Sequence, residues 1–370
     1  MVRNVWSTGL LVGLLAACGR GAQDAADAEY ADGVPEFTSA AAEVTGAAGE
    51  GLTSQALEQG LNAGAPALLV ETREAVRGLN GAVKAALDAL REMVDAGGGV
   101  SSAGEVRTYG PADKEGLTWR LRLKKLGVAR FAFRLEAKAV GAGDDSYAVV
   151  LEGALRRGTE ARRGRGILLL DLDALAALKP SLVASGKVAA SFVHLPAGRA
   201  WAYRVQDFTP DVAAVTPFRA AFVGHLTQVT GVRRMRFAAP FNLDGTPTAA
   251  REFVLGRVRH LPGVGGRVDV LAGGGDAGPN EYFLGSACWD AQESEGFAAL
   301  VRCTKGQPLT ACVVVTSRGD KATCGQGLSE AATPADGTAE EATAETDSPV
   351  GDPGDPGSVT SAEDWLSAQP

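Results

Sequence analysis

Five arginines gather around one short predicted turn, and their spacing points to anion binding. They are Arg156, Arg157, Arg162, Arg163 and Arg165, on either side of the turn segment GTEA. A guanidinium group pairs bidentately with phosphate or carboxylate, so this hairpin tip is a candidate anion-binding site. A second basic group, Arg233, Arg234 and Arg236, extends it if the fold brings the two together. The alternative interpretation is a solvated strand end.

Four cysteines, which can form disulfides or bind a metal, lie within 37 positions of one another: Cys288, Cys303, Cys312 and Cys324. An even number of cysteines in an exported protein predicts disulfides. We predict Cys303–Cys312, because a turn separates two strand-like runs there, and by elimination Cys288–Cys324. The metal-site alternative is weak, because the spacings of 15, 9 and 12 contain no C-x2-C pair.

No catalytic residue, metal ligand or cofactor is predicted. The three histidines, His194, His225 and His260, lack partners at metal-binding spacing, and the sequence has no nucleophile elbow, P-loop or dinucleotide fingerprint. Asp144 and Asp145 can together hold a cation, but the turn formers around them favour a hairpin turn. A hydrolase with a dispersed Ser-His-Asp triad stays open as an alternative, because triad residues need not be neighbours in sequence.

The elements that must position these residues are mostly strands. Apolar and charged residues alternate over 117–124, 130–139 and 147–155, as in antiparallel strands of a half-buried sheet. Segment 166–178 is apolar on both faces and predicts a buried strand that leads into a short helical turn. Nine more strands are expected at 187–194, 200–206, 218–223, 232–238, 252–260, 267–271, 281–287, 297–303 and 311–316.

One segment before the strands has helical periodicity. Between Pro66 and Ala96, apolar residues recur every three or four positions, which predicts an amphipathic helix. These residues are Val76, Leu79, Val83, Leu87, Leu90 and Val94. The expected fold class is therefore mainly β (α+β): a large curved antiparallel sheet, half-barrel or barrel of about ten or more strands, with one long N-terminal amphipathic helix.

Charge segregation gives the domain organisation. The whole chain has a net charge of −8, but residues 66–329 hold 34 Lys and Arg against 26 Asp and Glu. Residues 18–65 form an acidic, Ala- and Gly-rich linker, and residues 330–370 form an acidic tail expected to be disordered. The acidic ends shield a basic body, or the basic face meets an acidic partner. No nucleic-acid partner is predicted.

The N-terminus carries an export signal. Arg3 precedes an apolar run of about ten residues, too short to span a bilayer. The run ends in Leu15-Ala16-Ala17-Cys18, which resembles the lipobox of bacterial lipoproteins. The resemblance implies that residues 1–17 are a signal peptide, that Cys18 is lipidated, and that the chain is anchored in the outer membrane of a Gram-negative bacterium because Gly19 follows. The side of that membrane is left open.

A helix followed by many strands with one apolar face is a layout similar to that of periplasmic lipoprotein carriers. In those proteins a half-barrel sheet curves around a helix and encloses a hydrophobic cavity. No residue motif supports this similarity, and a fold alone does not establish a function. We expect a non-enzymatic lipoprotein that binds a hydrophobic or amphiphilic ligand or an envelope protein partner. The alternative is a structural or assembly lipoprotein that acts through its basic face and acidic tail.

Overall fold

The computed structural model describes most residues between 29 and 323 and three residues near the C-terminus. The described residues are 29–42, 67–97, 100–158, 163–180, 184–209, 217–227, 230–241, 243, 251–275, 277–323, 361, 362 and 364. Cys18, Arg162 and Cys324 lie outside them, as do the predicted signal peptide and most of the predicted tail.

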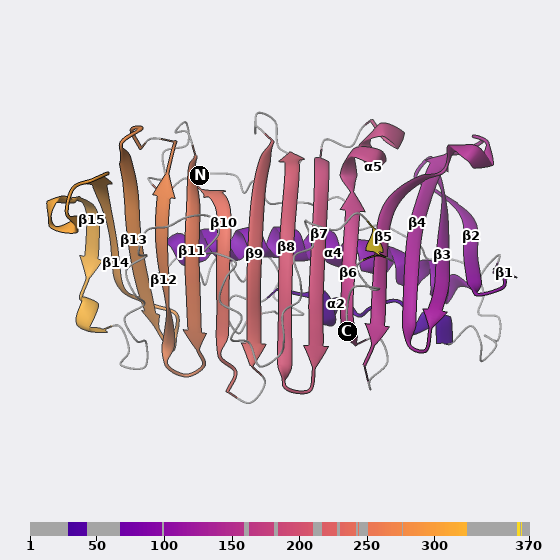
Figure 1. Cartoon of the computed structure of the whole chain (residues 1–370), viewed down its shortest axis with the longest axis horizontal. Coiled ribbons are helices and arrows are strands. Elements are labelled where there is room, and N and C mark those ends of the chain that lie inside the picture. Colours follow the sequence, from indigo (N-terminus) through magenta and orange to yellow (C-terminus); the bar gives the residue numbers. More distant parts are fainter. Residues whose placement is uncertain are drawn as a thin grey trace. The chain divides into compact units, whose positions relative to one another are not determined.

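Fifteen antiparallel strands form one open sheet in which strands adjacent in sequence are adjacent in space (Figure 1). The fold is mainly β, as predicted. The predicted alternative of a closed sheet is wrong, because β1 and β15 are separate edges of the described sheet. The strands are β1 (Ser101–Ala103), β2 (Val106–Lys114), β3 (Leu117–Gly127), β4 (Arg130–Ala139), β5 (Ala148–Arg157), β6 (Gly164–Asp171), β7 (Ser185–Leu195), β8 (Gly198–Thr209), β9 (Phe218–Thr227), β10 (Arg233–Phe241), β11 (Glu252–Leu261), β12 (Gly265–Gly273), β13 (Glu281–Asp290), β14 (Glu295–Thr304) and β15 (Val313–Gly319).

The described helices are α2 (Phe37–Ala40), α4 (Ala67–Ala96) and α5 (Leu172–Leu178), with short 3-10 turns at Asp144–Ser146, Leu309–Ala311 and Lys321–Thr323. All six apolar residues of the predicted helical stripe are buried on α4. The helix ends at Gly97, whose positive φ of 59° turns the chain away and lets its N–H bond the Val94 carbonyl. None of the described helices is both long and apolar enough to cross a bilayer.

The chain divides into two compact units. Unit 1 comprises residues 1–3, 42–77 and 220–349, and unit 2 comprises residues 4–41, 78–219 and 350–370. The start of α4, most of β9 and β10–β15 therefore belong to unit 1. The rest of α4, α2, α5 and β1–β8 belong to unit 2.

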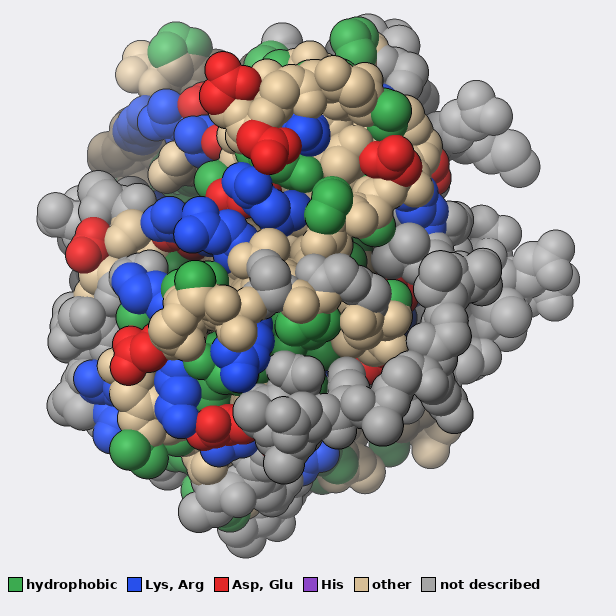
Figure 2. Space-filling model, turned by 90° about the vertical axis from the view of Figure 1, so that its right-hand side faces the viewer, with side chains coloured by type: hydrophobic (Ala, Val, Ile, Leu, Met, Phe, Trp, Pro, Cys, Tyr) green, Lys and Arg blue, Asp and Glu red, His purple; other side chains and the backbone are tan. Residues whose placement is uncertain are grey.

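In unit 2, the two faces of the sheet differ as the alternation predicts. Leu117, Leu121 and Leu123 of β3 are buried, whereas Arg120 and Arg122 lie on the opposite face. On that polar face, Arg120 pairs with Glu136 directly across from it, at 2.5 Å. Lys and Arg side chains are accordingly interspersed with Asp and Glu on the surface that Figure 2 shows. Cross-strand pairs of this kind stabilise a sheet face that water reaches.

The polar face of unit 2 also receives part of the predicted acidic tail. Ala362 is fully buried among Ala154, Ile167 and partly buried leucines, and its N–H donates to the Glu152 carboxylate at 2.6 Å. Glu152 also accepts a hydrogen bond from Arg134 at 2.9 Å. At least this residue of the tail therefore packs on the outer face of β5 and β6.

In unit 1, buried and exposed side chains also alternate along the strands, and an ion pair joins α4 to a turn of the sheet. Val254 and Val258 of β11 are buried, whereas the side chain of Phe253, on the opposite face of the same strand, is 48% exposed. At the start of α4, Arg73 forms an ion pair with Glu293, which lies in the turn between β13 and β14. Within unit 1, this ion pair joins the first turns of α4 to the turn between β13 and β14.

Glycines opposite large aromatic rings recur across the sheet. Phe133 faces Gly153, and Phe237 faces Gly256, each directly across a strand pair. A Cβ atom at Gly256 would lie 2.0 Å from the Phe237 ring, so the ring occupies the space that any side chain would need. Gly166 with Phe192 and Gly266 with Trp289 repeat the arrangement. Aromatic cover of a strand glycine restores apolar contact that the glycine itself cannot make.

Two strands, β1 and β2, were not predicted. β2 contains Gly110-Pro111, where the peptide bond is cis and the register with β3 shifts between Tyr109 and Ala112. This bulge interrupts the two-residue period on which strand prediction depends. The strand resumes at Ala112, and it is this second part of β2 that reaches the candidate site described below.

Candidate functional site

An acidic segment near the N-terminus, most of it within unit 2, packs against the strands of that unit. We call residues 29–42, which include α2, the strap. Tyr30 and Val34 of the strap are buried, and the Tyr30 ring contacts the edge of Phe131, with ring centroids 6.1 Å apart. The Tyr30 hydroxyl donates to the Glu105 carbonyl at 2.9 Å. This part of the predicted linker therefore forms a packed contact with the strands.

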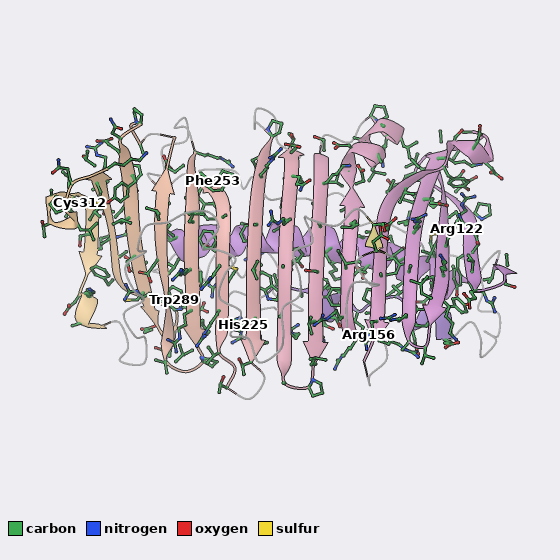
Figure 3. All side chains as sticks on the ribbon, in the orientation of Figure 1. Arg122, Arg156, His225, Phe253, Trp289 and Cys312 are labelled. Carbon is green, nitrogen blue, oxygen red and sulfur yellow. A yellow bond between two sulfur atoms is a disulfide. The ribbon has the colours of Figure 1, made fainter. Side chains whose placement is uncertain are left out.

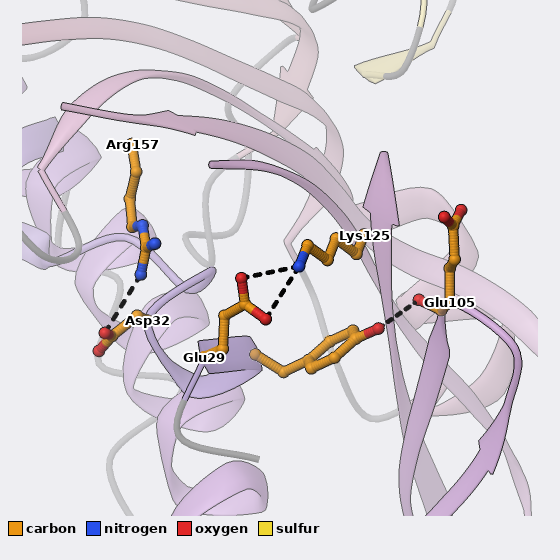
Figure 4. A network of polar contacts seen from close by, with 6 residues as sticks. Glu29, Asp32, Glu105, Lys125 and Arg157 are labelled. Carbon is orange, nitrogen blue, oxygen red and sulfur yellow. Dashed lines mark hydrogen bonds and ion pairs between the residues drawn. The ribbon is translucent and has the colours of Figure 1, made fainter. Parts of the chain in front are cut away.

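The strap carries three carboxylates that pair with three cations on or beside the strands, and Figure 4 shows the pairs of Glu29 and Asp32. Glu29 pairs with Lys125 at 2.8 Å, and Asp32 with Arg157 at 3.3 Å. Glu36 pairs with Arg163 at 3.4 Å. The acidic composition of this segment thus matches a basic surface on the same unit.

The predicted anion-binding arginines meet on neighbouring strand ends. Arg156 of β5, labelled in Figure 3, lies directly opposite Arg165 of β6, and Arg157 and Arg163 flank them in sequence. Arg162 lies outside the described residues. Two arginines of the cluster, Arg157 and Arg163, pair with carboxylates of the strap. Binding of an external anion by the cluster stays a prediction.

The second basic group lies in unit 1. Arg233 and Arg234 of β10 are directly opposite Leu226 and His225 of β9. Burial lowers the pKa of His225, and the positive charges of Arg234 and Arg236 lower it further. These arginines therefore act on a neighbouring histidine of unit 1.

The other histidines are also satisfied within the protein. His260 is buried, and its Nδ1 accepts a hydrogen bond from Trp289 Nε1 at 3.4 Å, since an indole N–H can only donate. Burial lowers the pKa of His260, which keeps the ring neutral. His194 Nδ1 contacts the Ser39 hydroxyl of the strap at 3.2 Å. Among the described residues, no three His, Cys, Asp or Glu side chains are grouped to hold a metal ion.

The cysteines and the paired aspartates behave as structural residues. The predicted Cys303–Cys312 disulfide is present and joins β14 to the segment before β15 (Figure 3). Cys288 is also disulfide-bonded, whereas its predicted partner Cys324 lies outside the described residues. Asp144 pairs with Lys138 at 2.7 Å, and this hydrogen bond lowers the pKa of the Asp144 carboxyl.

Unit 2 contains an apolar cavity between α4 and the sheet. Its volume is about 40 Å³, and it is partly open. A water molecule needs roughly 10–15 Å³ measured in this way, so the cavity exceeds a single water site. Its lining comes from α4, β2–β6 and α5: Ala86, Ala89, Met93, Ala112, Lys114, Trp119, Leu135, Val150, Leu151, Leu170 and Leu175.

Two of the lining residues carry polar atoms that the fold leaves unpaired. Lys114 Nζ and Trp119 Nε1 are both buried and have no hydrogen-bond partner among the described residues. The same holds for Oε2 of Glu92, which precedes the lining residue Met93 on α4. Leaving a buried donor or acceptor unpaired costs about 1–3 kcal/mol. We call these three side chains the polar corner.

The strand register explains why the two donors lie together. Ala112 of β2 is directly opposite Trp119 of β3, and Lys114 is two residues further along the same face. Diagonal neighbours of this kind are within reach of long and aromatic side chains. Both residues therefore face α4, where Glu92 and Met93 lie.

The ionisable groups of the polar corner are both perturbed toward their neutral forms. Burial raises the pKa of Glu92; the positive charge of Lys114 opposes this rise, and Asp88 adds to it. Burial lowers the pKa of Lys114, although Glu92 and Glu115 act in the other direction. The two groups thus sense each other's charge without forming a hydrogen bond.

The sequence interpretation missed the polar corner entirely. Lys114 lies in an unpredicted strand, and Glu92 is one of several charged residues outside the apolar stripe of α4. The available signal was Lys114 three residues before an amphipathic strand that contains Trp119. No family model, curated protein or solved structure matches this chain.

Proposed function

We propose that the chain is a non-enzymatic outer-membrane lipoprotein, anchored through Cys18, whose unit 2 binds a hydrophobic or amphiphilic ligand. The observation that carries the proposal is an apolar cavity with unpaired polar atoms at one corner. Small-molecule sites combine a largely apolar lining with a few polar groups in this way. The cavity volume of about 40 Å³ suits part of one alkyl chain and is far below that of a whole lipid.

The expected likeness to lipoprotein carriers supports the same proposal at the level of layout. In unit 2, residues of α4 and of the sheet enclose the cavity together, as a helix and a half-barrel would. The carrier-like arrangement, with a long helix on the concave face of a curved sheet, is part of what we propose.

Photocrosslinking tests ligand binding in the intact, membrane-anchored protein. A decyl chain carrying a diazirine is added to the full chain in nanodiscs, and labelled peptides are identified by mass spectrometry. We expect labelling of the α4 segment around Ala89 and of β2 around Ala112. Ala89→Leu, which fills the cavity, abolishes this labelling, whereas Lys84→Leu on the exposed side of α4 preserves it. Equal labelling of both variants at these peptides would refute the proposal.

The anchor is tested separately. Radiolabelled palmitate given to a Gram-negative host should enter the wild-type chain and not the Cys18→Ser variant. Incorporation in both chains, or in neither, would contradict lipidation at Cys18.

A second candidate function, docking of an envelope protein partner, is favoured by the edge strand β15. All seven of its residues are exposed, and Val313 and Val314 are 60% and 61% exposed. An exposed apolar edge strand offers unpaired backbone groups to a strand of another chain. Val314→Lys should abolish co-purification of a stoichiometric partner from the envelope, and retention of the partner would eliminate this candidate.

A further inference from the structure

The outer face of β5 and β6 carries an apolar patch, although charged pairs lie on this face elsewhere in unit 2. Ala154 of β5 and Ile167 of β6 lie directly opposite each other, and Leu126 and Leu169 pack beside them. Glu152, two residues before Ala154, shares this face because side chains alternate along a strand. β6 is therefore apolar on both of its faces, which is typical of a strand that is covered on both sides.

The C-terminal segment that covers this patch (yellow in Figure 1) begins as a capped helix. Ala362 and Asp364 are helical, and the Asp364 N–H donates to the Ser361 hydroxyl at 3.1 Å. The Ser361 hydroxyl in turn donates to the Asp364 carboxylate at 2.7 Å. Ser361 is thus the N-cap residue, and it satisfies one of the N–H groups that the first turn of a helix leaves without an intrahelical acceptor.

The sheet supplies the acceptor for a second of these N–H groups. The Ala362 N–H donates to one carboxylate oxygen of Glu152 at 2.6 Å. Arg134, directly opposite Glu152 on β4, donates to the other oxygen at 2.9 Å. The sheet therefore holds the carboxylate where it can receive the helix. The negative charge of Glu152 also lies at the positive end of the helix dipole, which is a favourable placement.

The space at Ala362 restricts which segments can dock. Its side chain is fully buried among Ala154, Ile167 and partly buried leucines. A larger side chain would need space that these neighbours occupy, because protein interiors are close-packed. A docking segment must therefore have an N-cap residue, followed at once by a small apolar residue whose N–H is free to donate.

We propose that the outer face of β5 and β6 is a docking site for the first turn of a helix, and that the C-terminal segment beginning at Ser361 occupies it as a displaceable latch. Of the three described residues of this segment, Ala362 alone is buried. So small a contact holds because the segment is tethered to its own site, at an effective concentration on the order of 1 mM. Release of the latch opens the patch to a helix of another protein that begins in the same way. The proposal does not depend on ligand binding in the cavity.

Binding of the segment as a separate peptide tests the docking site. A fluorescein-labelled peptide of residues 356–370 is titrated with the full chain in nanodiscs, and fluorescence polarisation gives its dissociation constant. In wild type the chain's own segment competes, whereas Ala362→Arg removes that segment from the site by bulk and charge. We expect the peptide to bind the Ala362→Arg chain at least about tenfold more tightly than wild type, because the tethered competitor is lost.

Matched variants tie this binding to the contacts described. Ala342→Arg makes the same charge change elsewhere in the tail and should leave the peptide affinity at its wild-type value. A peptide that itself carries Ala362→Arg should not bind, and a Ser361→Ala peptide should bind several-fold more weakly because it lacks its cap. Glu152→Gln, added to the Ala362→Arg chain, should weaken binding about tenfold because a charge-assisted hydrogen bond is lost. Thermal unfolding shows that each variant chain is folded.

Three results would overturn the latch. The first is equal peptide affinity of the wild-type and Ala362→Arg chains, and the second is failure of the peptide to bind either folded chain. The third is a dimer of the Cys18→Ser chain, seen by sedimentation velocity and lost on adding Ala362→Arg, because the segment would then dock on a second copy. A monomer with and without Ala362→Arg supports docking within one chain.

Discussion

Polar side chains of unit 2 are paired in one region and unpaired in another. Under the strap, Glu29, Asp32 and Glu36 each have a cationic partner, within 2.8–3.4 Å. At the polar corner, Lys114 and Trp119, which line the cavity, and Glu92, which does not, each bury a polar atom without a partner among the described residues. The strap carboxylates are thus paired within the chain, whereas the polar corner keeps hydrogen-bonding capacity that no described residue uses.

The difference teaches that a cluster of charges is a poor guide to binding unless its partners are known. The arginine cluster is the more conspicuous feature of the sequence, yet part of it neutralises the strap. The polar corner contains only two charges and is inconspicuous in the sequence, but it retains unsatisfied hydrogen-bonding capacity. An unpaired buried polar group lowers the stability of the folded state, so its presence in a protein calls for an explanation such as a role in binding.

The largest expected effect comes from detaching the strap. Tyr30→Ala removes a buried ring that contacts Phe131 and a hydroxyl that bonds Glu105. Loss of a buried aromatic side chain lowers the free energy of unfolding by about 3 kcal/mol. Urea denaturation measures the change, and Glu29→Gln, which removes only a half-exposed ion pair, should cost less than about 1 kcal/mol. Equal effects of the two substitutions would contradict a packed strap.

The next effect tests whether the strap carboxylates neutralise the arginine cluster. Asp32→Asn together with Glu36→Gln removes two negative charges and leaves Arg157 and Arg163 unneutralised, and each such arginine is worth about 1 kcal/mol at an anionic membrane. In a Cys18→Ser background, the double variant should bind phosphatidylglycerol liposomes more tightly than the parent by at least tenfold in a sedimentation assay. Unchanged binding would mean that the cluster faces no membrane even when its internal anions are neutral.

Replacing the unpaired charges should stabilise the protein, in contrast to replacing paired ones. Lys114→Met with Glu92→Leu exchanges two poorly satisfied ionisable groups for apolar side chains and should raise the free energy of unfolding by about 1 kcal/mol. The matched double variant, Arg157→Met with Asp32→Leu, removes a hydrogen-bonded pair and should give no gain. Urea denaturation distinguishes them, and the reverse order would remove the basis of the comparison.

The smallest effect is a pH dependence that arises at Glu92. Because burial raises its pKa in the folded state, the folded protein takes up this proton more readily than the unfolded chain. The stability that Glu92 contributes is therefore present below its ordinary pKa and is lost as pH rises through the folded value. The melting temperature of wild type relative to Glu92→Gln should fall between pH 4 and pH 7.5. A difference that does not vary with pH would show that Glu92 is not buried as described.

Much of the fold follows from local pattern. Strands β3–β15 coincide with predicted segments, because most of them have one dry face and one wet face. β2 escaped prediction because Gly110 and Pro111 break its alternation. The strap was interpreted as linker from its Ala, Gly and acidic content, although Tyr30 and Val34 supply the apolar contacts that dock it.

The candidate site could not be predicted for a different reason. Lys114 is singled out because its buried Nζ has no hydrogen-bond partner among the described residues. Whether a side chain has a partner depends on the three-dimensional arrangement and cannot be read from the sequence. The spacing of Lys114 and Trp119 in the sequence does not show that they are neighbours; the register between β2 and β3 brings these two residues together. The disulfide Cys303–Cys312 was predictable because its partners are close in sequence.

The most direct test of the central claim is fluorine NMR of the full chain labelled with 5-fluorotryptophan in nanodiscs. Decanol is titrated in, and the Trp119 resonance is assigned by its loss in Trp119→Phe. We predict that the Trp119 signal shifts saturably as its indole N–H gains an acceptor, while the buried Trp201 and Trp289 signals stay in place. A Trp119 signal that does not move while decanol saturates the protein would contradict the account.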